Sequence, residues 1–288
     1  MKQNLLKYMS ERMSGFSKGQ RQIAAYILEH YDRAAYMTAS RLGALVHVSE
    51  STVVRFADEL GFDGYPGLQR ALQEMARTHL TAAQRMEVAD NLMDKDTILD
   101  KVLLGDADKI RHTLEGLDRA AFNAAVDKIV GARRIYILGV RSSASLADFL
   151  TFNFRMMFDN LTPVTGTSGS EVFEQILTIG PEDVLIAISF PRYSKRTVRA
   201  VEFAHNAGAD VVALTDSAQS PLAAGCDQLL TARSDMASFV DSLVAPLSMI
   251  NALIVAMSLR HREEVSEHFA QLESLWERNH VYVGKDNA

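Results

Sequence analysis

From about residue 113 onward, short apolar runs alternate with stretches of helical periodicity. The runs that predict strands are Ile135–Leu138, Val184–Ile188 and Val211–Leu214, with Gln228–Thr231 as a further candidate. The stretches that predict helices are Ser143–Phe158, Glu171–Leu177, Lys195–Ala207, Met236–Arg260 and Glu263–Arg278. Because parallel strands need long crossover connections, this alternation predicts a parallel α/β sheet flanked by helices.

Residues 1–80, by contrast, show only helical periodicity. Ser17 and Gln20 have the spacing of a capping box and precede an apolar stripe. A second short helix is expected from Thr38 or Ala39, and a third from Ser49 to Gly61. A fourth is expected over residues 68–80, after breaks at Gly64, Pro66 and Gly67.

Two short helices joined by a tight turn, the second opening on a serine, predict a helix-turn-helix. The second helix of that unit lies in the major groove, and its first residues reach base edges. Its packing positions should be Val53, Val54, Phe56, Ala57 and Leu60. The candidate DNA-binding residues are Ser49, Ser51, Thr52 and Arg55 on this helix, with Lys18, Arg21 and Arg41 on phosphates. A small helical interaction domain with a solvated polar face is the alternative.

One continuous motif in residues 1–80 matches a known pattern. It is VSESTVVRFADELGFDGYPGLQRAL, over residues 48–72. The stretch from Ser17 to Ala71 resembles the N-terminal domain of RpiR/MurR-type bacterial transcription regulators. The matching positions are Ser49, Thr52, Arg55, Phe56, Leu60, Gly61, Phe62, Gly64, Tyr65 and Leu68. The resemblance implies binding to a double-stranded DNA operator, followed in the chain by a sugar isomerase (SIS) domain that senses sugar phosphates.

Ser142 and Ser143 follow the end of the first predicted strand, at Gly139, and precede a helix. Their hydroxyls could bind a phosphate or a sugar hydroxyl together with free N–H groups, or could only cap the helix. In SIS domains a Gly-x-x-Ser turn at this place meets the ligand, so the resemblance favours binding.

The stretch ISFPRYSKRT, residues 188–197, forms the next strand-to-helix turn. SIS domains typically carry Ser-x-Ser-Gly-x-Thr there; this chain keeps Ser189 and Ser194 but has Pro191-Arg192 in the middle. Proline removes an N–H, and Arg192 could supply a charged fork for a phosphate, a carboxylate or an acidic sugar. Alternatively, Arg192 pairs with a carboxylate of the protein or points to solvent.

A third loop, TGTSGSEVFE, contains Glu171 just inside a helix. Its carboxylate could accept hydrogen bonds from the ligand or could favour the helix N-terminus through the dipole. Asp216, at the end of another strand, is interpreted as a turn-forming residue.

The charge distribution supports a DNA-binding domain at the N-terminus joined to a domain of another kind. Residues 1–80 carry ten Lys and Arg against eight Asp and Glu, and the remaining residues carry 20 against 28.

An isomerase with an accessory helical domain is the alternative function. Isomerisation needs a general base and a general acid near the substrate. His205 lies well inside a predicted helix; no HExxH motif occurs, and no G-x-G-x-x-G follows a strand. We therefore expect no enzyme activity, no catalytic or metal-binding residue and no cofactor.

The expected architecture is an all-α helix-turn-helix domain (1–80), a helical linker (81–112) and an α/β SIS domain (113–288) that binds ligand and oligomerises. A homodimer or homotetramer would present paired heads to the operator. A single cysteine, Cys226, and the absence of a long apolar N-terminal stretch favour the cytoplasm. The apolar stretch Leu243–Leu259 is interrupted by polar residues, so it is expected as a core helix or an oligomer interface rather than a membrane span.

Overall fold

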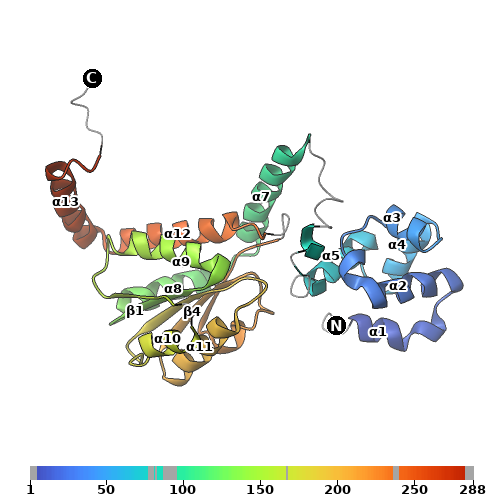
Figure 1. Ribbon diagram of the computed structural model, residues 1–288, viewed down its shortest axis with the longest axis horizontal. Helices are drawn as coiled ribbons and strands as arrows, with labels where there is room; N and C mark the ends of the chain where they lie inside the picture. The colour runs from blue at the N-terminus through green and yellow to red at the C-terminus, as the bar shows by residue number, and fades with distance from the viewer. Residues whose placement is uncertain are drawn as a thin grey trace. The chain divides into compact units, whose positions relative to one another are not determined.

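A computed structural model of the chain describes residues 5–76, 81, 83–86, 96–166, 168–235 and 240–282. The chain forms two compact units (Figure 1). The helical unit comprises residues 1–102 with 236–241, and the α/β unit comprises 103–235 with 242–288. The domain limits expected at residues 80 and 112 stay a prediction.

The helical unit is built from short helices around one apolar core. They are α1 (Leu5–Glu11), α2 (Lys18–Ala34), α3 (Ala39–Leu45), α4 (Glu50–Glu59) and α5 (Gly64–Ala76), with a 3-10 turn at Met13–Gly15. The predicted capping box is confirmed: Ser17 N–H donates to Gln20 Oε1 at 2.9 Å, and Gln20 N–H donates to Ser17 Oγ. The apolar side chains of all five helices meet in this core.

The start of α5 differs from the prediction, because the helix begins at Gly64 rather than at Leu68. Pro66 lies in its first turn, where backbone N–H groups have no acceptor within the helix, so proline is tolerated there. Gly64 has a φ of +62°, a conformation that favours glycine, and its N–H donates to Asp58 Oδ1 at 3.1 Å. Residues 77–80, the predicted end of this helix, lie outside the described residues.

Tyr65 ties α5 to the end of α2. Its hydroxyl donates to Met37 O at 2.9 Å and lies 3.3 Å from Ala34 O, and the side chain of Gln69 also donates to Met37 O. Tyr65 is buried, and burial raises the pKa of its hydroxyl from 10.0 to about 12.

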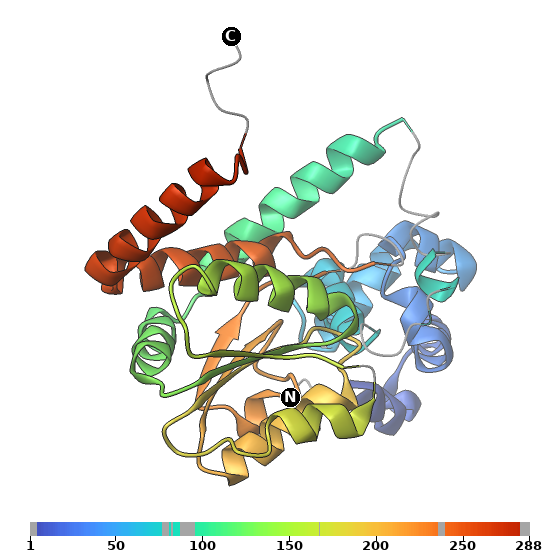
Figure 2. The same ribbon diagram turned by 60° about the vertical axis from the view of Figure 1, so that its left-hand side comes forward.

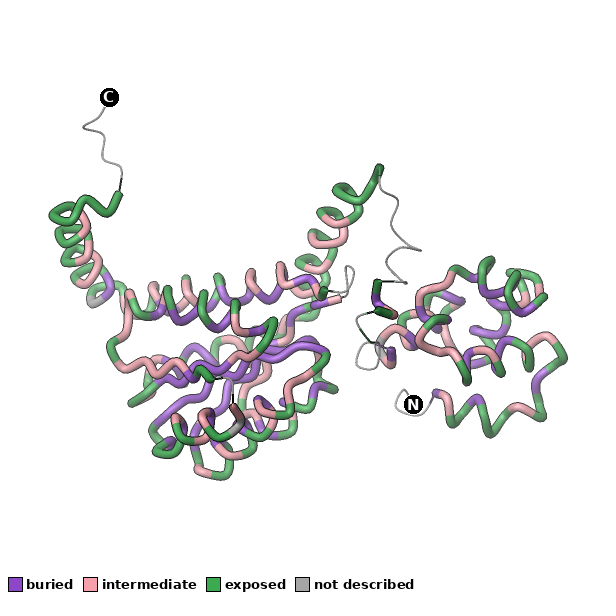
Figure 3. The backbone as a smooth tube through the Cα atoms, in the orientation of Figure 1, coloured by how far each residue is buried: buried purple, intermediate pink, exposed green. Residues whose placement is uncertain are grey.

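Helix α7 (Ile98–Glu115) runs across the division between the two units at residues 102 and 103. It accounts for part of the predicted helical linker, and residues 83–86 are also helical. Within the described chain α7 contributes no buried residue, and its tube in Figure 3 is green and pink throughout.

The α/β unit contains a five-stranded, fully parallel sheet in the order β2-β1-β3-β4-β5. Its strands are β1 (Ile135–Gly139), β2 (Leu161–Val164), β3 (Val184–Ile188), β4 (Asp210–Thr215) and β5 (Gln228–Thr231). Its helices are α8 (Arg119–Gly131), α9 (Ala144–Phe154), α10 (Gly169–Gln175), α11 (Lys195–Asn206), α12 (Val244–Arg260) and α13 (Arg262–Arg278), with 3-10 turns at Arg141–Ser143 and Ala223–Gly225. The predicted parallel α/β architecture is confirmed.

Helices cover both faces of this sheet. Helices α8, α9 and α12 share one apolar core with it, and α10 and α11 share the other (Figures 1 and 2). All five residues of β3 are buried, and the centre of the sheet is mostly purple in Figure 3. A strand covered on both faces is apolar along its length, which explains why the sequence reveals it.

Two elements of this unit are missing from the sequence prediction, β2 and α8. Three of the four residues of β2 are only partly buried, and Pro163 pairs with Ile137 at the sheet edge, where proline is tolerated. The start of α12 also differs, since the helix begins at Val244 rather than at Met236. Residues 236–239 lie outside the described residues, and residues 240–243 are not helical.

No single helix of the described chain is long and apolar enough to cross a membrane. Val244–Arg260 and Val265–Arg278 pass the length and composition test only together, as a pair bent by 104°. In the α/β unit one side of α12 packs into the core, through Met249, Ile250, Leu253 and Met257.

The end of β1 and the start of α9 approach each other closely at Gly139. A Cβ atom at this position would lie 2.4 Å from Ser143 O and 2.8 Å from Ala147 Cβ. Only glycine fits such a contact, so residue 139 fixes where the helix starts relative to the strand.

The buried Tyr65 hydroxyl predicts a loss of stability at alkaline pH. Its pKa is raised in the folded state, so its contribution is complete below pH 10 and is lost as the pH rises through about 12. A shift of two units corresponds to about 2.7 kcal/mol of unfolding free energy. The free energy of unfolding, measured by urea unfolding and circular dichroism between pH 8 and 11.5, should therefore fall more steeply with pH for the wild type than for Tyr65→Phe. Parallel curves for the two proteins would contradict this.

The contact at Gly139 predicts different effects on stability for two glycine substitutions. Gly139→Ala should lower the unfolding free energy by about 1–3 kcal/mol, because the new methyl group meets backbone. Gly131→Ala is the matched control: nothing lies within 4 Å of its Cβ position at the end of α8, so its effect should stay within about 1 kcal/mol. Equal stability of the two variants in urea unfolding would contradict the packing argument.

Candidate functional site

The turn between α3 and α4 is held by a close backbone contact. Val48 N–H donates to Gly43 O at 2.9 Å, and a Cβ atom at Gly43 would lie 2.8 Å from Val48 O. His47, within the turn, has a φ of +56°. Two helices joined by so tight a turn form the predicted helix-turn-helix.

The first turn of α4 is organised by Ser49, its N-cap. Ser49 Oγ accepts a hydrogen bond from Thr52 N–H at 3.3 Å and lies 2.9 Å from Ser51 Oγ and 2.8 Å from Thr52 Oγ1. This hydroxyl group therefore fixes the start of the helix, as an N-cap should.

The two faces of α4 differ as the sequence predicts. Of the predicted packing positions, Val53, Phe56, Ala57 and Leu60 are buried, whereas Val54 is only half-buried. Among the predicted DNA-binding residues, Ser49, Ser51 and Arg55 are exposed and Thr52 is half-buried. Arg55 Nε donates to Ser51 O at 3.2 Å, which directs the side chain toward the first turn. The structure thus brings these four residues together at the N-terminal end of α4.

The three predicted phosphate contacts lie at the starts of two other helices. Lys18 and Arg21 are exposed on the first turns of α2, and Arg41 is exposed on the first turn of α3. The start of α2 packs near the start of α4, since a Cβ atom at Gly19 would lie 3.4 Å from Thr52 Cγ2. Lys18 and Arg21 consequently flank the first turn of α4.

In the α/β unit, the order of the strands reverses at β1. Strand β1 pairs with β2 on one side and with β3 on the other. The loop after β1 leads to α9 on one face of the sheet, and the loop after β3 leads to α11 on the opposite face. Open α/β sheets bind ligands at the carboxyl ends of strands at such a reversal. We call residues 139–143 and 189–194 the switch-point edge.

Ser142 and Ser143 belong to this edge but differ in their surroundings. Ser143 is buried, whereas Ser142 is exposed. Ser143 occupies the N-cap position of α9, yet its side chain makes no capping hydrogen bond. The Ser143 hydroxyl therefore does not cap the helix, which was one of the two roles that the sequence left open.

Ser189 and Ser194 lie together at the other half of the edge. Ser189 is buried, and its Oγ accepts a hydrogen bond from Ser194 N–H at 3.4 Å. Ser194 is the N-cap of α11 and accepts from Arg196 N–H at 3.2 Å. Thr197, also in the first turn, is fully buried, and its hydroxyl has no hydrogen-bond partner among the described residues. The turn thus gathers three hydroxyl groups at the positive end of α11.

The middle of the turn is held by Tyr193 rather than by its backbone. Tyr193 hydroxyl donates to Asp216 Oδ1 at 2.6 Å, and Thr215 Oγ1 donates to the same oxygen at 3.2 Å. Asp216 is buried, so its carboxylate anchors the turn from the end of β4. Arg192 is exposed and forms no ion pair within the described parts of the chain. Within the described residues Arg192 therefore does not pair with a carboxylate of the protein, which was one alternative from the sequence.

Glu171 has a place in the start of α10. Its Oε2 accepts a hydrogen bond from Ser168 N–H at 3.1 Å, while Ser168 Oγ accepts from Glu171 N–H, which completes a capping box. Of its two predicted roles, support of the helix start is confirmed, and a ligand contact stays a prediction. Arg196 Nη1 donates to Gly166 O at 2.9 Å and links this loop to α11.

The sequence prediction omits Arg141 and the anchoring role of Asp216. Arg141 is exposed and has a φ of +58°. The signal for Arg141 is present in the sequence, since it stands between the strand end and the two serines. The pairing of Tyr193 with Asp216 has no local sequence signal, because the two residues are 23 positions apart.

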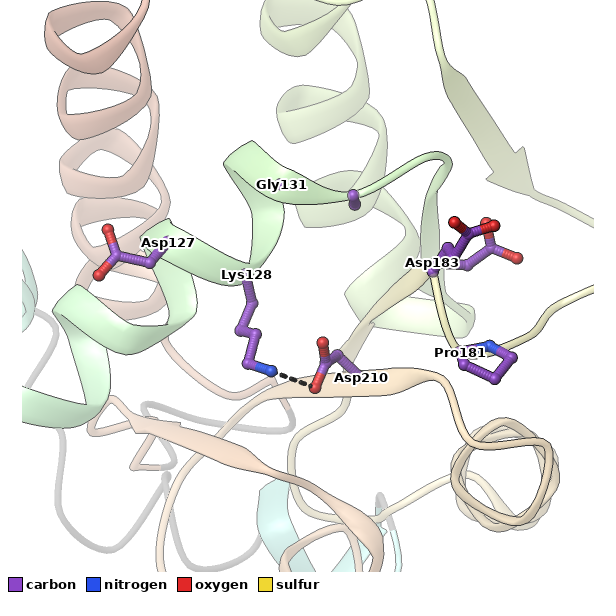
Figure 4. Close-up of a pocket in the computed structure, with 8 residues that line it drawn as sticks. Asp127, Lys128, Gly131, Pro181, Asp183 and Asp210 are labelled. Carbon is purple, nitrogen blue, oxygen red and sulfur yellow. Dashed lines mark ion pairs between the residues drawn. The ribbon is translucent and has the colours of Figure 1, made fainter.

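A shallow hollow lies at the opposite, amino edge of the sheet (Figure 4). Its charged groups are paired: Lys128 Nζ lies 2.9 Å from Asp210 Oδ1, and Arg133 Nη2 lies 2.7 Å from Asp183 Oδ2. Burial alone would raise the pKa of Asp183, but hydrogen bonds from Arg133 and Gly180 N–H, with the arginine charge, lower it. Because its charges compensate one another and strand carboxyl ends lie elsewhere, this hollow is not the candidate site.

His205 and His261, two histidines of the α/β unit, are not residues of the switch-point edge. His205 is exposed near the end of α11, and the ring of His261 packs edge-on against Phe158. Among the described residues, no group of three or more His, Cys, Asp or Glu side chains is arranged to hold a metal ion.

Two family models match the chain. The model of the helix-turn-helix domain of the rpiR family matches residues 3–78, and the SIS domain model matches residues 128–256. HexR, a helix-turn-helix transcriptional regulator of Pseudomonas aeruginosa, is 25% identical over 290 residues and covers 99% of both chains. HexR of Escherichia coli is 25% identical over 279 residues, which cover 94% of this chain and 93% of the relative.

Solved structures share the fold. The sugar isomerase domain of an RpiR transcription factor from Sphaerobacter thermophilus is 26% identical with a TM-score of 0.58, and covers 62% of this chain and 99% of its own. Vibrio vulnificus NanR, complexed with ManNAc-6P, is 22% identical with a TM-score of 0.59, and covers 96% of this chain and 98% of its own. With both family models matched in this order, the chain belongs to the RpiR-type transcription regulators, which join a helix-turn-helix domain to a SIS domain.

Proposed function

We propose that this regulator binds an operator through α4 and that a sugar phosphate or acidic sugar, bound at the switch-point edge, controls its operator affinity. The observation that carries the proposal is the pairing of two sites in one chain. An exposed, well-capped helix start reads DNA, and a strand-order reversal lined by serines receives a ligand.

At the DNA, Arg55 is the principal base-reading residue. Its bond to Ser51 O leaves the terminal guanidinium nitrogens to form a fork on guanine O6 and N7. Ser49, Ser51 and Thr52 contribute hydroxyl groups to phosphate or base. Lys18, Arg21 and Arg41 fix the register through phosphates, which carry no sequence information themselves.

At the effector site, the buried Ser143 and Ser189 contact the ligand from the two strand ends. Ser142, Ser194 and Glu171 complete its polar surroundings, and Arg192 provides charge where Pro191 removes a backbone N–H. NanR, whose fold this chain shares, is complexed with ManNAc-6P, which supports a phosphorylated sugar as the effector class.

The protein acts as a sensor rather than as an isomerase. Isomerisation requires a general base within reach of the substrate. Glu171 is engaged by Ser168 N–H and Asp216 by the Tyr193 hydroxyl, while His205 is exposed on α11. A sensor needs affinity and coupling only, and no cofactor.

A homodimer or homotetramer in the cytoplasm presents two heads to a pseudo-palindromic operator. Effector binding then alters operator affinity, and operator binding must alter effector affinity by the same factor. The outward residues of α12 are one candidate for the interface, since Val255 and Leu259 are large, apolar and exposed.

Replacing Arg55 tests the assignment of α4. Arg55→Ala should weaken binding about tenfold or more to operator DNA selected by the wild type from a random pool, because one bidentate base contact is lost. Gel shifts of the full-length protein measure this. Arg119→Ala, an exposed arginine of the α/β unit, is the control and should leave affinity unchanged. Unaltered specific binding by Arg55→Ala would remove α4 from the role of recognition helix.

A metabolite panel tests the effector class. Sugar phosphates or acidic sugars should raise the melting temperature of the full-length protein, because a ligand of the folded state stabilises it. Ser189→Ala should reduce the shift, whereas Ser274→Ala, an exposed serine of α13, should not. A shift with neutral sugars alone would refute the anion site, and turnover of a sugar phosphate would favour the isomerase instead.

A further inference from the structure

Positive side chains gather at the switch-point edge of an otherwise acidic unit. Arg141 and Arg192 are exposed there, and Lys195 is exposed directly after it at the start of α11; none of the three forms an ion pair or a side-chain hydrogen bond within the described residues. Yet the α/β unit carries 22 acidic against 17 basic side chains. The excess positive charge is therefore local and belongs to the strand ends.

The carboxylates in the loops of this region do not neutralise these cations. Glu171 accepts from Ser168 N–H at the start of α10. Asp216 is buried and accepts from the Tyr193 hydroxyl. Two arginines and a lysine thus remain available to an anion that reaches the edge from solvent.

Arg141 is also in a conformation that costs stability. Its φ of +58° lies in the left-handed region, which glycine adopts without strain and arginine does not. Its side chain is exposed, so neither packing nor an internal hydrogen bond repays the strain. Strained residues of this kind are found at ligand-binding sites, where the side chain serves function instead of stability.

The two arginines lie in connections that lead to opposite faces of the sheet. Strands β1 and β3 are neighbours, with Gly139 paired to Ile188. Arg141 opens the connection to α9, which packs on one face, and Arg192 lies in the connection to α11, which packs on the other. A phosphate seated at Ser189 and Ser194 occupies only the α11 side, which leaves Arg141 for another part of the ligand.

We propose that Arg141 binds a second negative group of the effector. The effector is then a sugar derivative with two separated anions, such as a phosphate and a carboxylate or two phosphates, each held by one arginine fork. This inference rests on the proposed function, because it assigns a further residue to the same site and narrows the class of effector.

Calorimetric titration of the full-length protein tests this with defined probes. Glucose 6-phosphate and gluconate carry one anionic group; 6-phosphogluconate and fructose 1,6-bisphosphate carry two. At least one two-anion probe should bind tenfold or more tightly than either one-anion probe. Arg141→Gly should remove that advantage and leave glucose 6-phosphate within twofold of the wild type. Arg134→Ala, an exposed arginine just before the amino end of β1, is the matched control and should change nothing.

The outcomes separate this inference from the proposed function. If one-anion probes bind as tightly as the best two-anion probe, or if Arg141→Gly weakens both classes equally, the second anion subsite is overturned while the anion site stands. If no anion in the panel binds, the proposed effector site itself is overturned.

The melting temperature of ligand-free Arg141→Gly gives an independent readout. It should rise, because glycine relieves the left-handed strain, even though affinity for the two-anion probe falls. A lower melting temperature would show that Arg141 stabilises the fold and would overturn its assignment to the ligand.

Discussion

The reversal of strand order at β1 is the constraint on which the α/β unit depends. Because β1 lies between β2 and β3, the loops after β1 and β3 must leave toward opposite faces of the sheet. The contact at Gly139 then lets α9 start close to the strand end, since Ser143 O lies 2.4 Å from the position that a Cβ atom would take. Ser143 is held beside the strand end by this backbone geometry and not by its own hydroxyl.

The chemistry of the edge follows from one residue, Pro191. A turn that loses a backbone N–H needs other donors for an anion and another means of holding its shape. The Tyr193 hydroxyl bond to buried Asp216 supplies the shape, and Ser189 brings its hydroxyl to the start of α11. The site therefore relies on side-chain donors and charge where a glycine-rich turn would rely on backbone, and such donors favour ligands with full negative charges.

The sequence predicts this fold well where burial is strong and the signal is local. Strand β3 is buried on both faces and appears as an unbroken apolar run, and the capping box of α2 occupies four consecutive residues. Strand β2 is not predicted from the sequence, because this edge strand, which contains Pro163, is only half-buried. Of the site, the pairing of Ser189 with Ser194 is local enough to predict. The bond from Tyr193 to Asp216 and the left-handed φ of Arg141 depend on backbone geometry that periodicity does not encode.

The covalent chain passes between the two units at residues 102/103, 235/236 and 241/242. The last passage is fixed on both sides. Asp241 pairs with the buried Arg85 of the helical unit at 2.8 Å, and Ser242 Oγ donates to Asp106 of α7 at 2.6 Å. Separating a buried ion pair is costly, so the pair of Asp241 with Arg85 holds this segment in the helical unit. Helix α12, which begins two residues after Ser242, is therefore connected through only a short stretch of chain to a segment anchored in the helical unit.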